Sequence, residues 1–330
     1  MKICLLLTMN DPRLWTLARQ MGVGHAVAKL HPAYTDDSAP HSLDALARAQ
    51  KRFSGAEIKL VGLEGDQFDM SRIKLGKPGW EDDLELYIRM IRNMGELGIG
   101  LLCYNFMAGI GWYRTATDVE ERGGAIVSAF DIDVAGREDP HPEAGVSEED
   151  LWTNYERFLT AVVPEAERAG VTLALHPDDP PVSPLRGIGR IFTNLAAFDR
   201  AYQLAPSPSN GVTFCQATFR AMEQELETAA RHFGSSGRLS FVHLRDISGS
   251  REHFRETFHD NGPTDMVRML TLYKDLGFSG YVRPDHVPAM AGERQDKGQS
   301  HTLSAGYGTL GRLYAVGYIK GILEAIDGNG

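Results

Sequence analysis

The sequence contains few cysteines, no long apolar run and no excess of positive charge, and each absence excludes a class of protein. The 330 residues include three cysteines, Cys4, Cys103 and Cys215, whose odd number and wide spacing do not suit a disulfide framework. No apolar run approaches the roughly 18 residues that a membrane-spanning helix needs. The formal net charge of −10 gives the chain no electrostatic reason to bind nucleic acid or an anionic membrane. We therefore expect a cytoplasmic protein with neither a membrane nor a nucleic acid as partner.

Linkers, low-complexity tracts and breaks in composition are also lacking. Hydrophobic residues make up 42% of the chain, which is enough for a large core. α/β barrels commonly reach roughly 250 residues or more as one domain, so we expect residues 1–330 to form a single domain. No phosphate-binding glycine fingerprint follows the first apolar run, which argues against a nucleotide cofactor.

Short apolar runs alternate with longer amphipathic segments along the whole chain. Short continuous runs predict strands buried on both faces, hence a parallel sheet covered by helices. Eight strand–helix units predict an α/β protein with a closed (β/α)8 TIM barrel, and an open doubly wound sheet is the alternative. The predicted strands are residues 2–8, 25–30, 58–64, 99–106, 171–177, 211–215, 239–246 and 280–283. The predicted helices are residues 12–21, 42–53, 80–97, 147–169, 194–204, 218–233, 264–276 and 310–326.

Three long segments without a clear pattern follow predicted strands. They cover roughly residues 108–145, 249–263 and 287–306. Irregular segments of this length inside a compact domain are commonly lids or binding loops. In a barrel, all three would lie at the carboxyl ends of the strands, on the face that carries the active site. We therefore predict long loops on the catalytic face.

Metal-ligating side chains stand at the ends of the last four predicted strands. They are His176, Cys215, His243 and Asp285. Neighbouring barrel strands lie about 4.8 Å apart and their tips converge, so four side chains on one arc can reach one ion. Taken singly, each has an ordinary alternative as a small apolar residue, a structural histidine or a turn residue. The joint pattern favours a mononuclear metal site.

The mixed ligand set restricts the choice of metal. Thiolate, imidazole and carboxylate together suit a first-row ion such as Mn²⁺, Fe²⁺, Co²⁺ or Zn²⁺ rather than Ca²⁺ or Mg²⁺. A catalytic site must also keep coordination positions open for the substrate. Histidine ligands usually donate their second N–H to an acceptor. Asp178 and Asp246 are candidates for that role, and turns at strand ends are an equally good explanation for both.

His286 and Tyr307 are candidate acid–base residues. His286 directly follows the proposed ligand Asp285, and the alternative is a supporting or surface position. Tyr307 lies between two glycines, which allow a tight loop that could carry the phenol to the metal. A plain turn tyrosine is the alternative.

Four arginines are candidates for binding a substrate carboxylate, because a guanidinium matches the fork of a carboxylate. They are Arg114, Arg186, Arg245 and Arg283. Three further polar residues either serve the site or cap the helix that follows them. They are His259, Asp260 and Asp265.

At these residues the chain resembles the mannonate dehydratase family of sugar-acid enzymes. The matching segments, which keep the family's order, are LLCYNFMAGIGWYRT (101–115), LHPDDPPVSPLRGIGRI (175–191), GVTFC (211–215), FVHLRD (241–246), DM (265–266), RPDH (283–286) and GYG (306–308). The resemblance implies a (β/α)8 barrel akin to xylose isomerase with a Mn²⁺ or Fe²⁺ ion. It also implies a lyase that dehydrates D-mannonate to 2-keto-3-deoxy-D-gluconate.

The resemblance further implies roles for individual residues. The family's metal ligands fall on His176, Cys215, His243 and Asp285. Its catalytic pair falls on His286 and Tyr307. Within or beside the matching segments we expect substrate contacts from Asn105, Trp112, Arg114, Asp178, Arg245 and Arg283.

Several positions depart from the family pattern and leave the substrate open. Residues 216–219 lack the usual Gly-Ser, Arg186 replaces an apolar aromatic residue, Asp246 stands where Asn is usual, and Val287 replaces a glycine. A related aldonate, or an isomerase or epimerase reaction on the same barrel, is therefore the alternative. A non-catalytic sugar-acid sensor is a further alternative, but the chain carries no DNA-binding or signalling module. A small sugar acid is the expected partner, and a homo-oligomer is compatible with the sequence.

Overall fold

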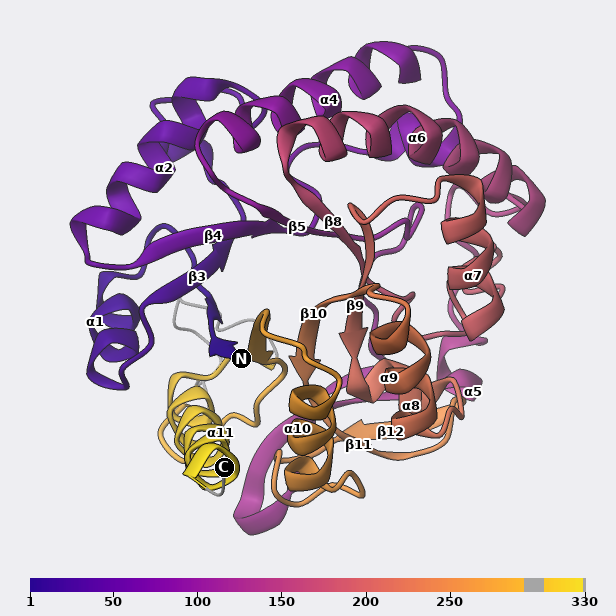
Figure 1. Ribbon diagram of the computed structural model, residues 1–330. Coiled ribbons are helices and arrows are strands. Elements are labelled where there is room, and N and C mark those ends of the chain that lie inside the picture. Colours follow the sequence, from indigo (N-terminus) through magenta and orange to yellow (C-terminus); the bar gives the residue numbers. More distant parts are fainter. Residues whose placement is uncertain (294–305, 329–330) are drawn as a thin grey trace.

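A ring of parallel strands forms the centre of the fold, and helices surround it (Figure 1). The computed structural model describes residues 1–293 and 306–328. The larger sheet runs in the order β1-β13-β10-β9-β8-β5-β4-β3-β2. Its strands are β1 (Lys2–Ile3), β2 (Leu5–Leu6), β3 (His25–Ala28), β4 (Lys59–Glu64), β5 (Leu101–Tyr104), β8 (Thr172–Leu175), β9 (Asn210–Cys215), β10 (Leu239–Leu244) and β13 (Tyr281–Pro284).

The first predicted strand closes the ring. It is present as two short strands, of which β1 pairs with β13 and β2 pairs with β3, both in parallel. Cys4 lies between them, and its N–H donates to the carbonyl of Val282 at 2.9 Å. Because β1 and β2 are consecutive parts of one segment, the ring has eight strand positions. The predicted (β/α)8 barrel is confirmed, and the open doubly wound sheet is excluded.

Most helices follow the strands of the ring and pack on its outside (Figure 1). The helices are α1 (Pro12–Gln20), α2 (Leu43–Gly55), α3 (Ser71–Leu75), α4 (Trp80–Glu96), α5 (Ile132–Ala135), α6 (Glu148–Ala169), α7 (Leu195–Leu204), α8 (Gln216–Ala221), α9 (Leu226–Ser235), α10 (Met266–Asp275) and α11 (Thr309–Gly328), with the 3-10 turns η1 (Pro32–Tyr34) and η2 (Arg122–Gly124). Of these, α5 and η2 follow strands of a second, antiparallel sheet. The single helix predicted over residues 218–233 is wrong. The chain forms α8 and α9 instead, because Glu223 between them has a φ of +61°, which a right-handed helix cannot continue.

The strands are buried on both faces, as continuous apolar runs require. Side chains such as Val61, Leu101 and Phe241 point into the barrel and fill it together with Cys4 and Cys103. A much larger apolar cluster fills the space between the strands and the helices. The barrel interior is therefore packed, and open space is left only near its two ends.

Two of the three segments expected to be loops contain a second sheet. Its antiparallel strands, in the order β11-β12-β7-β6, are β11 (Ile247–Gly249), β12 (His253–Glu256), β7 (Ala125–Asp131) and β6 (Ala116–Glu121). The expectation of irregular loops here was wrong, because strands from two segments far apart in the sequence pair with each other. Most of the third segment, residues 294–305, lies outside the described residues.

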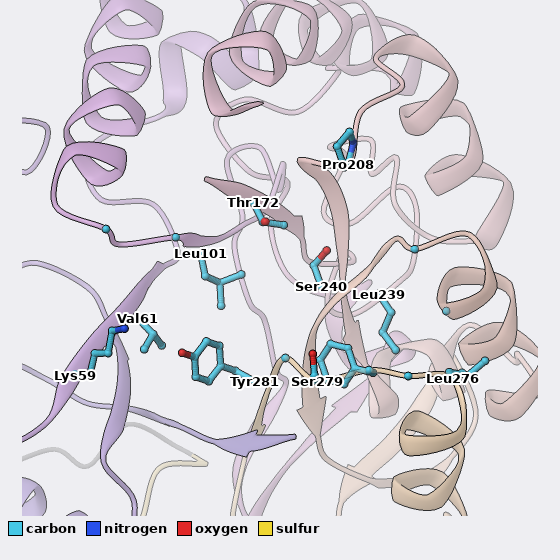
Figure 2. A pocket seen from close by; sticks show the side chains of 17 residues that line it. Lys59, Val61, Leu101, Thr172, Pro208, Leu239, Ser240, Leu276, Ser279 and Tyr281 are labelled. Atoms are coloured by element: carbon cyan, nitrogen blue, oxygen red, sulfur yellow. The ribbon is translucent and has the colours of Figure 1, made fainter. Parts of the chain in front are cut away.

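A hollow of about 550 Å³ opens at the amino ends of the strands (Figure 2). Its lining includes the first residues of several strands, such as Lys59, Leu101, Thr172 and Tyr281. None of the 17 described residues that line it is a histidine, cysteine, aspartate or glutamate. The described lining of this hollow therefore offers no metal ligand or carboxylate. Within residues 1–293 and 306–328, no helix is long and apolar enough to cross a membrane.

The tight contact between β4 and β5 gives a test of the barrel packing. A Cβ added at Gly62 in β4 would lie 2.5 Å from the backbone carbonyl oxygen of Leu101, a contact that backbone cannot relieve by a rotamer change. We expect Gly62→Ala to lower the free energy of unfolding by about 1–3 kcal/mol, measured by urea unfolding. The control is Gly24→Ala, since a Cβ there meets no atom within 4 Å. Equal stability of the two variants would contradict the packing described for β4 and β5.

Candidate metal centre and its cavity

A cavity of about 570 Å³ lies at the carboxyl ends of the strands. It is bounded by strand ends and by Thr117 of the antiparallel sheet, so the second sheet helps to cover it. Its described lining is Glu64, Gly65, Cys103, Tyr104, Asn105, Met107, Trp112, Thr117, His176, Asp179, His243, Arg283, Asp285, His286 and Tyr307.

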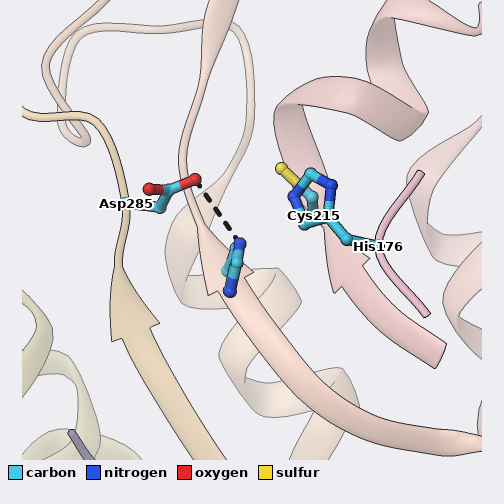
Figure 3. A group of neighbouring side chains, drawn as sticks. His176, Cys215 and Asp285 are labelled. Atoms are coloured by element: carbon cyan, nitrogen blue, oxygen red, sulfur yellow. Dashed lines mark ion pairs between the residues drawn. The ribbon is translucent and has the colours of Figure 1, made fainter. Parts of the chain in front are cut away.

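Four potential ligands converge at the edge of this cavity (Figure 3). One ligand atom from each of four residues lies within 4.8 Å of the others. They are His176, Cys215, His243 and Asp285. Each comes from the end of a different strand, namely β8, β9, β10 and β13, which are neighbours in the ring. The structure thus brings together the four side chains that the sequence singled out, and their role as ligands stays a prediction.

The polar atoms of this cluster fit a bound cation. His243 is buried, and its Nδ1 has no hydrogen-bond partner although Asp285 Oδ2 lies 3.4 Å away (dashed in Figure 3). His176 Nδ1 lies 2.7 Å from the carbonyl oxygen of Pro177, which holds the proton on Nδ1 and leaves Nε2 as an acceptor. Burial lowers the pKa of His176, so its imidazole is neutral, the form that binds metal. A buried nitrogen without a partner beside a thiol and a carboxylate is what a metal site leaves when only protein atoms are considered.

The ion pair with Arg283 favours the anionic form of Asp285. Burial alone would raise the pKa of this carboxyl, but Arg283, His286 and His243 together outweigh it and hold the pKa well below its usual range. Arg283 Nη1 lies 3.0 Å from Asp285 Oδ1, and both side chains are almost fully buried. Asp285 is therefore an anion, as a ligand must be.

Two other groups of potential ligands are less suited to a metal. Glu64, Cys103 and His243 also lie within 4.8 Å of one another. However, Arg283 donates to Glu64, and its Nε lies 3.2 Å from His243 Nε2, so a positive charge already lies between them. The third group is Asp131, Asp133 and His253, whose side chains are 43%, 73% and 50% exposed. Its Asp131 is occupied as the N-terminal cap of α5.

His286 and Tyr307 lie next to each other at the cavity, with ring centroids 5.5 Å apart. The Tyr307 hydroxyl donates to Asp285 Oδ1 at 2.9 Å. Burial and then the charge of Asp285 raise the pKa of Tyr307, so the phenol keeps its proton. His286 Nδ1 lies 3.0 Å from Glu256 Oε1, while Nε2 faces Asp285 Oδ1 at 3.8 Å.

The backbone of His286 is strained, and its neighbours hold it in place. Its φ is +39°, a region that L-residues other than glycine rarely adopt. Gly306 (φ +84°) comes so close that an added Cβ would lie 3.0 Å from the His286 ring, and this approach brings Tyr307 beside the imidazole. Strain of this kind persists where the surroundings enforce it, often at active sites. The expectation that these glycines carry the phenol to the proposed ligands agrees with this geometry.

A buried network of two arginines and two carboxylates supports His286. Arg114 bonds to Asp179 at 2.7 and 3.0 Å and to Glu256 at 2.9 Å. Arg245 bonds to Glu256 Oε2 at 2.8 Å and to Asp179 Oδ2 at 2.7 Å. Neither arginine lines the cavity, so the expectation that they contact the substrate is not supported. Their guanidinium groups bond to the two carboxylates instead. Glu256, one of these carboxylates, in turn lies within hydrogen-bond distance of His286 Nδ1.

Three of the other expected substrate contacts do reach the cavity. They are Asn105, Trp112 and Arg283. Trp112 is 39% exposed and packs edge-on against His286, with ring centroids 5.2 Å apart. Asn105 Oδ1 accepts from Lys74 Nζ at 3.0 Å and from the Met107 N–H at 3.1 Å, which leaves Nδ2 as its donor.

Two aspartates do not have the expected roles. Asp178 lies behind the cavity lining, and its Oδ2 accepts from the Phe192 N–H at 2.8 Å. It therefore neither contacts the cavity nor accepts from His176, whose Nδ1 is bonded to a backbone carbonyl. Asp246 accepts from the N–H and hydroxyl of Thr264 at 2.6 and 2.7 Å rather than from His243. Both act as the strand-end turn residues that were the alternative.

The remaining candidates support the fold around the site. Arg186 lies outside the cavity and donates to the carbonyl of Asp139 at 2.8 Å. His259 Nε2 bonds to the carbonyl of Leu244 at 2.6 Å, and Asp265 caps α10. Asp260 pairs with Arg122 at the surface.

Three carboxylates at the site were missed from the sequence. Glu64 is the last residue of β4, so its strand-end position was a signal that could have found it. Asp179 follows His176 by three residues, in a segment already singled out. Glu256 lies in β12, where no local pattern indicated a strand, and only the pairing of distant segments places it beside His286.

Comparison with known proteins gives consistent matches. A family model described as D-mannonate dehydratase (UxuA) matches residues 17–144 and 141–329. Mannonate dehydratase 2 of Halalkalibacterium halodurans is 36% identical over 283 residues, covering 77% of this chain and 79% of that protein. Mannonate dehydratase of Streptococcus agalactiae serotype V is 34% identical over 313 residues, covering 86% and 87%.

Solved structures match as well. The crystal structure of mannonate dehydratase from Streptococcus suis serotype 2 has a TM-score of 0.88 and 29% identity, covering 99% of this chain and 95% of that chain. A structure of L-ribulose 3-epimerase has a TM-score of 0.59 at 16% identity, covering 100% and 97%. The second likeness shows the barrel fold alone.

Glu256 gives a test of the buried network. Burial alone would raise its pKa, but Arg245, His286 and Arg114 outweigh it and lower the pKa to about 2. Removing one partner of a buried ion pair costs about 3–5 kcal/mol, so we expect Glu256→Gln to lower the free energy of unfolding by that amount near pH 7. Glu227→Gln is the control, since Glu227 pairs at the surface with Arg268, whose side chain is 67% exposed.

The sign of the pH dependence follows from the lowered pKa. The stability that ionised Glu256 contributes is present above its usual pKa of 4.5 and is lost as pH falls towards about 2. The difference in unfolding free energy between the wild type and Glu256→Gln should therefore become smaller as the pH falls from 4.5 towards about 2. A constant difference, measured by urea unfolding at several pH values, would contradict the network.

Proposed function

Because the chain belongs to the D-mannonate dehydratase family, we propose that it removes water from D-mannonate to give 2-keto-3-deoxy-D-gluconate. The observation that carries the proposal is the cluster of four potential ligands, three of which line the same cavity as His286 and Tyr307. The chain is an enzyme of the hydro-lyase class that acts on a small sugar acid. We also propose that the chain acts as one domain, and a homo-oligomer stays a prediction.

We propose that His176, Cys215, His243 and Asp285 hold one divalent first-row ion, with Mn²⁺ or Fe²⁺ preferred. The convergence of these atoms and the unpartnered Nδ1 of His243 support this assignment. When bound, such an ion supplies positive charge that stabilises an anion developing beside the substrate carboxylate.

Dehydration requires removal of the C2 proton and departure of the C3 hydroxyl group as water. We assign the first task to His286 Nε2, because Glu256 holds the proton on Nδ1 and leaves the lone pair on Nε2. Glu256 also stabilises the imidazolium that forms, since it lies 3.0 Å from Nδ1. A histidine positioned by a carboxylate is a common general base.

The second task falls to Tyr307, which carries its proton on the phenol. A hydroxide ion leaves poorly unless it is protonated, and Tyr307 can deliver that proton to the C3 oxygen. Asp285 accepts a hydrogen bond from the phenol at 2.9 Å and so fixes its position. Net transfer of one proton from the His286 imidazolium to the Tyr307 phenolate resets the pair. The enol product then tautomerises to the 2-keto acid.

The positions that depart from the family pattern support D-mannonate over a related acid. None of Arg186, Asp246, Val287 and residues 216–219 is among the described residues that line the cavity. Gln216 Oε1 instead faces the backbone N–H of Arg245, and Phe219 stacks on Phe214 in the core. These differences therefore change the packing behind the site and leave the cavity wall as it is. None of the described residues that line the cavity favours an isomerase or epimerase reaction.

Turnover of aldonates tests the function and the role of His286 together. We expect the Mn²⁺-loaded protein to form a 2-keto-3-deoxy acid from D-mannonate, measured with a panel of aldonates. His286→Asn should lower kcat by about 10²–10⁴-fold, the usual contribution of an acid–base group, while metal content stays unchanged. The control His253→Asn changes a half-exposed histidine that is not among the residues lining the cavity and should retain activity.

Two results would contradict these assignments. A wild-type protein with stoichiometric metal that forms no 2-keto-3-deoxy acid from D-mannonate would overturn the substrate. Normal turnover by His286→Asn would overturn the role of the imidazole while leaving the substrate intact.

Metal content tests the ligand set without reference to turnover. Asp285→Asn replaces an anionic ligand by a neutral amide, so we expect the variant to lose most of its metal after dialysis, measured by elemental analysis. Asp178→Asn is the control, because Asp178 is a buried aspartate outside the cluster whose bond to the Phe192 N–H an amide oxygen can keep. Full retention of metal by Asp285→Asn would exclude Asp285 as a ligand.

A further inference from the structure

We propose that Glu64 determines substrate specificity by accepting a hydrogen bond from a hydroxyl group of the sugar-acid chain, on one of the carbons C4 to C6. This inference rests on the proposed function, because it concerns the part of the same substrate that does not react. It adds a residue that neither the sequence patterns nor the proposed chemistry used.

The two oxygens of Glu64 differ in their surroundings. Oε1 accepts a hydrogen bond from Arg283 Nη2. Oε2 is buried and has no hydrogen-bond partner among the described residues. A buried polar atom without a partner is uncommon in folded proteins and requires an explanation. Glu64 lines the cavity, so the missing donor can come from a molecule bound there.

The chemistry of the carboxylate defines the group that it recognises. An ionised carboxylate only accepts hydrogen bonds, so the partner must be a donor. A substrate hydroxyl group meets that need, whereas the substrate carboxylate would be repelled. Glu64 therefore also sets the direction of the substrate, with the carboxylate towards the four proposed ligands and the hydroxyl groups towards β4.

The positions of the strands agree with this direction. The four proposed ligands lie at the ends of β8, β9, β10 and β13, on one arc of the ring. Glu64 ends β4, and Asn105 follows the end of the neighbouring β5. Asn105 Oδ1 is occupied by Lys74 and by a backbone N–H, which leaves Nδ2 as a donor. An acceptor and a donor side by side suit two adjacent hydroxyl groups of a polyol.

The experiment pairs a variant with substrate analogues. Glu64→Gln keeps the shape and an oxygen for Arg283 but replaces the other carboxylate oxygen by an amide nitrogen. The substrates are D-mannonate and its 4-deoxy, 5-deoxy and 6-deoxy analogues. We expect the variant to lose about 10- to 100-fold in kcat/KM on D-mannonate, the effect of one hydrogen bond to a charged group. On the analogue that lacks the contacted hydroxyl group, the wild type and the variant should have equal kcat/KM.

The analogues separate recognition from a structural effect. If Glu64→Gln acted only through Arg283, its loss would be the same on all four substrates, and that result would overturn the inference. An unchanged kcat/KM on D-mannonate would overturn it as well. Metal content and thermal midpoint are measured alongside, since both should stay as in the wild type.

A matched control is available on the second sheet. Glu121 in β6 is also a glutamate with a buried Oε2 that lacks a hydrogen bond, but it does not line the cavity. Glu121→Gln should therefore retain the wild-type kcat/KM on every substrate. Failure of the proposed function would appear differently, as absence of D-mannonate turnover in the wild type itself.

Discussion

A single buried guanidinium, that of Arg283, sets the charges on which the site depends. It pairs with Glu64 and with Asp285, and its Nε lies 3.2 Å from His243 Nε2. Two buried carboxylates beside each other would otherwise repel and favour protonation. Arg283 lies in contact with both and offsets this repulsion, so one is available to a metal and the other to a hydroxyl group. The same cation occupies the space in which a second metal could otherwise bind.

The barrel and the four-residue cluster could be predicted because they depend on local patterns. Continuous apolar runs identify buried strands whatever their partners, and the ring places the ends of successive strands next to each other. His176, Cys215, His243 and Asp285 stand at such ends, so their convergence follows from topology alone. Tyr307 required one more signal, the glycines that allow its segment to approach His286.

The support around the site could not be predicted because it depends on pairing across long stretches of chain. Glu256 reaches His286 only because β12 pairs with β7, and β12, with the sequence HFRE, has no apolar pattern by which it could be found alone. The same sheet explains why Arg114 and Arg245 were assigned to the substrate. An arginine beside a strand end indicates an anion nearby, and the sequence does not say whether that anion belongs to the ligand or to the protein.

The divided first strand has a consequence for the order in which the protein forms. β1 pairs with β13, so the ring closes through a contact between the beginning of the chain and a strand nearly 280 residues later. Contacts between residues so distant in sequence form slowly, because a long loop must be closed first. During synthesis the early strands therefore form an open sheet with an unpaired edge until β13 has been made. An unpaired strand edge is a site at which chains aggregate. Asp285 follows β13, the last of the parallel strands along the chain, so the proposed ligand cluster is complete only once β13 has paired with β10.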